Sequence, residues 1–157
     1  MGNDVGNARD GLIRKAVAIA DKHETGKTKA VVKRYIAQFY DDLSFDDLSG
    51  VSPQDLYAAA ASAFAFAKTR SSEKPKIRVL APPRGKRAKR TWPNDRTVIE
   101  IINDDMPFLV DSVTAELERL GEPAQLVIHP VIPVKRDSSG KLIDVFASDE
   151  PYLDETA

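Results

Sequence analysis

The stretch from Thr97 to Leu120 constrains the fold strongly, because two different hydrophobic periods adjoin within it. Its first residues, TVIEII, carry β-branched side chains on both faces, which predicts a strand over 97–102 in the centre of a sheet. After the polar turn NDDMP, apolar residues recur at helical spacing and Gly121 follows as a C-cap (Leu109, Val113, Leu117 and Leu120). A strand followed directly by an amphipathic helix predicts an α+β domain.

Two more strands are predicted downstream of this helix. The first covers 124–134, where Pro130 and Pro133 indicate a bulge or an edge position. The turn DSSG at 137–140 then leads into a strand over 141–146. Together these elements form a βαββ unit, which is the first half of a ferredoxin-like sandwich.

The missing half of that sandwich could come from upstream residues, as in a circular permutation. Ser52 is a good N-cap, Pro53 suits the first helical position, and Asp55 completes a capping box, so a helix is predicted over 53–69. A short strand follows over 76–80. If the two elements complete the sandwich, strand 76–80 must pair antiparallel with strand 97–102.

Further helices are predicted before residue 50. One has an apolar face at i, i+3, i+4 and i+7, and another covers Lys29 to Tyr40 (the first face is Ile13, Ala16, Val17 and Ala20). The repeated DDLSFDDLSG at 41–50 favours helix-capping turns, since it lacks calcium-loop spacing. We therefore expect a helical lead-in over 1–50, an α+β domain over 51–150 and a loose acidic tail over 151–157.

The bulk composition excludes several classes of protein. The 157 residues carry a formal net charge of -1, so no global charge attracts nucleic acid or membranes. Cysteine is absent, which excludes disulfides and thiolate chemistry. No apolar run approaches the length of a membrane span, and Arg14 and Lys15 interrupt the only stretch that resembles a signal peptide. We expect a cytoplasmic chain with no membrane partner.

Three carboxylates around the turn are candidates for metal binding or acid–base chemistry: Asp104, Asp105 and Asp111. If the helix begins near Met106, Asp105 is its N-cap, because a carboxylate is stabilised by the free N–H groups and the dipole there. No histidine follows at ligand spacing. A structural cap is the favoured interpretation, with metal binding or catalysis as the alternative.

A basic cluster is the second candidate site, with five positive charges in seven residues and Trp92 close by (Arg84, Lys86, Arg87, Lys89 and Arg90). Such a loop could contact phosphates while the indole stacks on a base. However, the predicted strands 97–102 and 124–134 lack the aromatic pair that RNA-recognition domains use. A solvated flexible loop is the favoured alternative.

No other motif assembles into an active site. His129 lies between Ile128 and Pro130 in an apolar segment, and His23 lies near a helix end, so a structural role explains each. There is no phosphate-binding glycine loop and no nucleophile motif. We expect this segment to contain no catalytic, cofactor-binding or metal-binding residue.

Two blocks, NDDMPFLVDS and LVIHPV, occur here in an order and separation that resemble the N-terminal region of bacterial large-subunit NAD-dependent glutamate dehydrogenases. The similarity covers most of residues 30–147. It implies an ACT-like domain within an enzyme that converts L-glutamate to 2-oxoglutarate and ammonia with NAD. The catalytic and NAD-binding residues would then lie beyond residue 157. The implied partners are the remainder of the same enzyme and a second copy of it in a homo-oligomer.

The resemblance also assigns a role to the turn after the first strand. ACT domains that bind amino acids do so at this turn, where a Pro-Gly pair permits close approach, so an effector loop is implied here (Asn103, Asp104, Asp105, Met106, Pro107 and Phe108). Phe108 stands in place of the glycine and its side chain obstructs the backbone N–H groups. The leading hypothesis is a regulatory or assembly module; the alternatives are an amino-acid sensor using this loop and a nucleic-acid-binding module using the basic loop.

Overall fold

The computed structural model describes residues 2–71 and 73–147, and the tail predicted over 151–157 lies outside these residues. The helices and strands follow in this order: α1 (Gly2–His23), α2 (Gly26–Phe39), α3 (Phe45–Leu48), α4 (Pro53–Ala67), β1 (Lys76–Leu80), β2 (Val98–Ile102), α5 (Leu109–Arg119), β3 (Val134–Arg136) and β4 (Leu142–Val145). The prediction of an α+β chain with N-terminal helices is confirmed. In the described residues, no helix is both long and apolar enough to cross a membrane.

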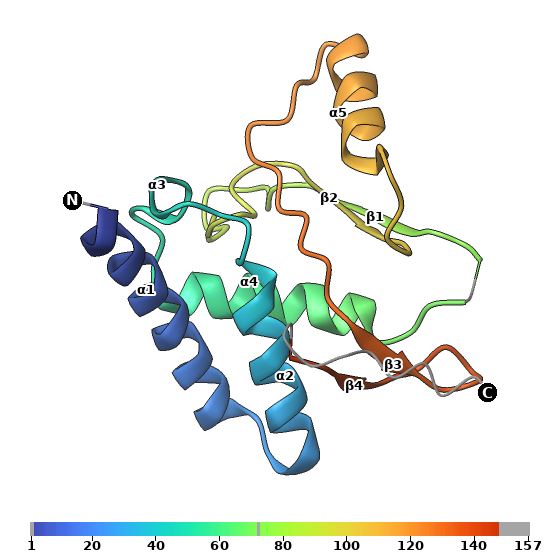
Figure 1. The fold of residues 1–157 in the computed structure, drawn as a ribbon. Helices are drawn as coiled ribbons and strands as arrows, with labels where there is room; N and C mark the ends of the chain where they lie inside the picture. The colour runs from blue at the N-terminus through green and yellow to red at the C-terminus, as the bar shows by residue number, and fades with distance from the viewer. Residues whose placement is uncertain (1, 72, 148–157) are drawn as a thin grey trace.

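The core lies between α1, α2 and α4. Figure 1 shows α1 and α2 side by side, with α4 crossing them. The predicted apolar stripes supply the buried residues, which include Ile13, Ala16 and Ala20 of α1, Val32, Tyr35 and Ile36 of α2, and Leu56, Ala60, Ala63, Phe64 and Ala67 of α4. The alanines of α4 let the helix backbones approach closely. This core is continuous across residue 50, since α4 packs against both earlier helices.

Short polar caps define where α3 and α4 begin. The Ser44 hydroxyl accepts a hydrogen bond from the Asp47 backbone N–H, and the Asp47 carboxylate accepts one from the Ser44 N–H. The Ser52 side chain likewise accepts from the Asp55 N–H at the start of α4. The helix-capping turns predicted for DDLSFDDLSG are therefore confirmed.

Strands β1 and β2 form an antiparallel ribbon in which Lys76 pairs with Ile102 and Leu80 with Val98. This is the pairing that the permuted arrangement requires. The ribbon attaches to α4 through Arg78, whose Nη2 donates to the Ser62 carbonyl oxygen at 3.1 Å. In Figure 1 the ribbon lies between α4 and α5.

The prediction of a strand over 124–134 is wrong, and so is the prediction that β2 lies in the centre of a sheet. The described strands form two separate two-stranded sheets, β1–β2 and β3–β4, so they do not form one ferredoxin-like sheet. Residues 124–133 instead run without ladder pairing, because Pro130 and Pro133 have no backbone N–H to donate. Three apolar side chains of this segment still pack against the helical core (Leu126, Ile128 and Ile132).

The predicted hairpin turn at 137–140 joins β3 and β4. The Asp137 carboxylate accepts hydrogen bonds from the backbone N–H groups of Ser139 and Lys141. Helix α2 holds the hairpin: Arg34 Nη2 donates to Asp144 Oδ1 at 2.7 Å, and Gln38 Nε2 donates to the Phe146 carbonyl at 2.6 Å. The hairpin thereby belongs to the same core as the helices.

Helix α5 stands apart from the helical core and contributes no buried residue. Its C-terminus is a Schellman motif, in which the Glu122 N–H donates to the Leu117 carbonyl and the Gly121 N–H to the Glu118 carbonyl. Gly121 has a φ of +80°, so the predicted C-cap is confirmed.

Candidate functional site

The loop over 103–108 connects β2 to α5 and lies at the surface. Residues 104–108 are exposed, and Phe108 is 76% exposed. Within the loop, the Asn103 side-chain amide contacts Met106 Sδ at 3.3 Å. The six predicted effector-loop residues are thus continuous on one exposed connection between a strand and a helix.

The predicted N-cap role of Asp105 is wrong. Helix α5 begins at Leu109, and its N-cap residue is Phe108, whose φ of +63° lies in the left-handed region and whose side chain makes no capping hydrogen bond. Pro107 disfavours a helical conformation for the residue before it, so the helix starts after the proline rather than at Met106. Asp111 lies in the first turn, where the helix dipole favours its charge.

Asp104 is joined to the helical part of the molecule by an ion pair with Arg70, which follows α4. The two side chains differ greatly in exposure, at 9% for Arg70 and 74% for Asp104. Arg70 uses Nη2 for this contact. Its other terminal nitrogen, Nη1, is buried and has no hydrogen-bond partner.

Arg136 of β3 lies close enough to influence the same charges. Burial lowers the pKa of Arg136, the neighbouring Arg70 cation lowers it further, and Asp104 opposes both effects. Arg136 Nη1 donates to the Gly140 carbonyl oxygen at 3.0 Å. The Arg136 guanidinium therefore lies within electrostatic influence of the Arg70–Asp104 ion pair, where the end of α4, the β3–β4 hairpin and the loop over 103–108 converge.

A hollow of about 370 Å³ adjoins this cluster, lined by Thr69, Arg70, Ser71, Lys74, Pro75, Lys76 and Ser139. Three of these residues are cationic and none is acidic. Lys76 Nζ donates to the carbonyl oxygens of Phe66 and Thr69, at 2.7 and 2.8 Å, and so caps the end of α4. The described lining is accordingly electropositive and polar.

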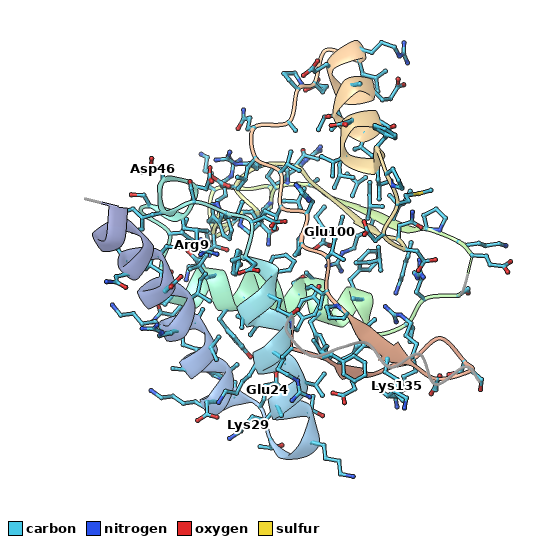
Figure 2. The ribbon with its side chains drawn as sticks, in the orientation of Figure 1. Arg9, Glu24, Lys29, Asp46, Glu100 and Lys135 are labelled. Atoms are coloured by element: carbon cyan, nitrogen blue, oxygen red, sulfur yellow. The ribbon has the colours of Figure 1, made fainter. Side chains whose placement is uncertain are left out.

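A second ion pair, Arg78–Glu100, crosses the β1–β2 ribbon beside the cluster. Figure 2 labels Glu100 between the ribbon and α4. Both side chains are largely buried, and Arg78 also donates to Ser62 of α4. This pair satisfies its own charges, so it serves the packing of the ribbon on α4.

The five basic residues over 84–90 are all exposed, in an irregular loop between β1 and β2. Trp92 is not placed to stack on a base, because its ring is partly buried against the core and lies 6.2 Å from the Tyr40 ring. The structure therefore exposes the five cations to solvent, whereas the aromatic residue predicted to act with them is partly buried against the core.

The remaining sequence candidates are spread across the fold. His129 borders a hollow of about 330 Å³, and its Nδ1 lies 3.6 Å from Asp42 Oδ2, beyond hydrogen-bond length. The His23 ring stacks on Tyr57 at 5.6 Å. Among the described residues, no three acidic, histidine or cysteine side chains gather in a way that could hold a metal ion.

Arg70 and Arg136 were not predicted as site residues. Arg70 lies in the polar stretch KTRSSEKPK and Arg136 precedes a turn, so each resembles an ordinary solvated arginine in the sequence. The ion pair of Arg70 with Asp104 joins residues 34 positions apart, which no local pattern indicates. The one sequence signal is that Arg70 directly follows the predicted helix over 53–69 and precedes Pro75 by five residues, and this signal is not specific.

Comparison with known proteins gives a consistent result. The family model described as "Glutamate dehydrogenase, ACT1 domain" matches residues 35–157. An NAD-specific glutamate dehydrogenase of Halomonas elongata is 35% identical over 121 residues, which are 77% of this chain and 7% of that protein. One from Pseudomonas aeruginosa is 30% identical over 124 residues, 79% of this chain and 8% of that protein. No solved structure matches the chain.

Proposed function

The chain belongs to the ACT1-domain family of glutamate dehydrogenases, and from this premise we propose that it is a non-catalytic regulatory and assembly domain of an NAD-dependent glutamate dehydrogenase. The parent enzyme would convert L-glutamate to 2-oxoglutarate and ammonia, and would hold NAD outside this segment. The observation that carries the proposal is the family match over residues 35–157.

The proportions of the relatives support a domain role. The chain spans only 7% and 8% of the two relatives, so most of each relative lies outside the matched region. The partners that follow from the proposal are the remainder of the same enzyme and further copies of it.

The proposal is tested on the enzyme that contains this segment. NADH formation from L-glutamate is measured for the intact enzyme, for a version lacking residues 35–147, and for the 157-residue chain alone. We expect no activity from the chain alone, and an altered oligomeric state or altered response to amino acids in the shortened enzyme. Glutamate oxidation by the chain alone, or a shortened enzyme unchanged in both properties, would contradict the proposal.

Amino-acid sensing at the loop over 103–108 is a second candidate. It is favoured by the exposure of this connection between β2 and α5, where the Asp105 carboxylate is exposed and the Asp104 carboxylate is exposed but paired with Arg70. Phe108 is itself strongly exposed to solvent. Calorimetric titration with a panel of amino acids decides the matter, and no heat of binding at millimolar ligand would exclude it.

Nucleic-acid binding through the loop over 84–90 is a third candidate, favoured only by the exposure of its five cations. Phosphate contacts of this kind weaken steeply as salt concentration rises. If the candidate is right, RNA or DNA retention falls with salt and is lost when the five side chains are neutralised. Retention that survives neutralisation would exclude this loop.

A further inference from the structure

The Arg70 side chain is a buried cation whose hydrogen-bonding capacity is only partly used. A guanidinium presents its N–H donors as a rigid fork that suits both oxygens of a carboxylate. Here one arm of the fork, Nη2, contacts Asp104, and the other terminal nitrogen, Nη1, is enclosed without an acceptor. Since a buried donor left unpaired is destabilising, this arrangement favours any anion that can engage both arms.

The carboxylate that now contacts Arg70 is easy to remove. Asp104 lies on an exposed loop, its side chain is 74% exposed, and a single oxygen forms the contact. If Asp104 turns outward, water solvates its carboxylate, whereas Arg70 stays enclosed with its charge uncompensated. The ion pair is therefore asymmetric, and an incoming anion needs to displace only the exposed partner.

The surroundings of Arg70 favour an anionic occupant. Arg136 adds a second guanidinium nearby, and the adjoining hollow of about 370 Å³ includes Lys74 and no acidic residue among those that line it. This volume lies within the range typical of small-molecule sites. Lys74 is exposed and could neutralise a second negative group on the same ligand.

We propose that Arg70 anchors a binding site for the carboxylate of a small organic acid, and that Asp104 is the internal group which this carboxylate displaces. The class of ligand follows from the contact already present, because Arg70 holds a carboxylate in the free molecule. Displacement of Asp104 releases the loop over 103–108 from the end of α4, so ligand binding alters the strand-to-helix connection. As a route of regulation, the inference rests on the proposed function; as a binding site, it stands on this geometry.

The test compares succinate with succinamide, which has the same carbon skeleton and no charge, by calorimetry on the 157-residue chain at constant ionic strength. Wild-type protein is expected to bind succinate and not succinamide. Asp104→Asn removes the internal competitor, so succinate binding should tighten about three- to tenfold. Arg70→Lys keeps the charge but loses the fork, and should weaken binding about tenfold or more.

A control variant on α5 and a check of folding by circular dichroism accompany these measurements. Arg119→Gln removes an arginine from an exposed ion pair with Glu116 on α5, away from the hollow, and should leave succinate binding unchanged. Circular dichroism verifies the fold of each variant, and the exposed Asp104→Asn variant remains informative if Arg70→Lys does not fold. Absence of succinate binding in both wild type and Asp104→Asn, weaker binding in Asp104→Asn, or full binding in folded Arg70→Lys would overturn the proposal.

Inorganic phosphate is titrated in parallel, to separate a carboxylate site from a general anion site. Binding of phosphate without succinate would overturn the assignment to carboxylates. The measurement involves no enzyme activity, so its failure leaves the glutamate dehydrogenase role standing, and failure of the enzyme assay leaves a positive binding result intact.

Discussion

Among the glycines of the described residues, Gly140 is the position with the least tolerance for a side chain. It has a φ of +81°, and a Cβ there would lie 2.0 Å from the Arg70 carbonyl oxygen. The Arg70 backbone N–H also donates to the Gly140 carbonyl at 3.0 Å. The close approach of these two backbones attaches the hairpin turn to the segment that carries the buried guanidinium.

Gly121 offers a matched control for that position, since its φ of +80° is the same and a Cβ would meet nothing within 4 Å. Gly121→Ala should lower the free energy of unfolding by about 1–2 kcal/mol, the penalty of a left-handed backbone. Gly140→Ala should lower it by about 1–3 kcal/mol more, because the new methyl group collides with backbone. Urea denaturation measures both, and equal losses would show that the hairpin adjusts without strain.

Two buried tyrosines predict how stability depends on alkaline pH. Burial raises the pKa of Tyr40 and of Tyr35 well above the ordinary value near 10. In the unfolded chain both phenols ionise above about pH 10, whereas in the folded chain they stay neutral. Their contribution to stability is therefore complete below pH 10 and is lost as the pH rises beyond it, at up to about 1.4 kcal/mol per pH unit for each phenol.

The variant Tyr40→Phe should remove about half of this alkaline dependence. It should also lower stability at neutral pH by about 1 kcal/mol, because the Tyr40 hydroxyl donates to the Leu56 carbonyl at 2.7 Å. Unfolding free energies measured between pH 8 and 11 give the slope. A slope identical to that of the wild type would mean that Tyr40 ionises in the folded protein.

At the scale of elements, the β3–β4 hairpin depends on α2 for its position. Arg34 binds both Asp144 and the Val145 carbonyl, while Val145 is completely buried. The Arg34 and Asp144 side chains are each partly exposed, so solvent weakens the ion pair. The hydrogen bond to the backbone carbonyl is then the larger part of the attachment.

Arg34→Ala should consequently loosen the hairpin more than it destabilises the helices. We expect a loss of about 1 kcal/mol in global stability and faster amide exchange in β3 and β4 than in α1. Arg119→Ala on α5 is the control, because that arginine pairs only with Glu116 on its own helix in the described structure. Uniformly faster exchange throughout the core would contradict the local role.

At the scale of the whole molecule, one face of the β1–β2 ribbon leaves large apolar side chains in solvent. Alternate residues of a strand face opposite sides, so Ile77, Val79 and Ile99 lie on one face and Arg78 and Glu100 lie on the face toward α4. The first three are strongly exposed, with Val79 at 62%. Clustered apolar exposure of this kind is typical of surfaces that contact another protein.

The assembly role predicts that this face mediates self-association. Sedimentation at high protein concentration should detect oligomers of the wild-type chain, and Val79→Lys should shift them toward monomer. Ile143→Lys, at an exposed apolar position on β4, should have no effect. A wild-type chain that remains monomeric would argue against assembly through this segment alone.

The helices, their caps and the local turns follow from the order of amino acids alone. Periodic stripes such as that of α4, the serine caps and the DSSG turn depend on interactions within a few residues, which the order of amino acids specifies directly. The antiparallel pairing of β1 with β2 agrees with the prediction made from the permuted ferredoxin-like order, in which strand 76–80 pairs with strand 97–102. The family was recognised from two contiguous blocks of sequence.

The contacts between distant segments depend instead on how the elements pack. Pro130 and Pro133 predicted a bulge or an edge position in a strand, yet the missing N–H donors leave residues 124–133 unpaired, with side chains packed on the helices. Helix α5 begins after Pro107, at Leu109, so Asp105 does not have the predicted capping role. Asp104 forms an ion pair with Arg70, 34 positions away in the sequence, because packing of the ribbon on α4 brings the loop over 103–108 to Arg70. Contacts of that range depend on the packed arrangement of whole elements, which local periodicity does not encode.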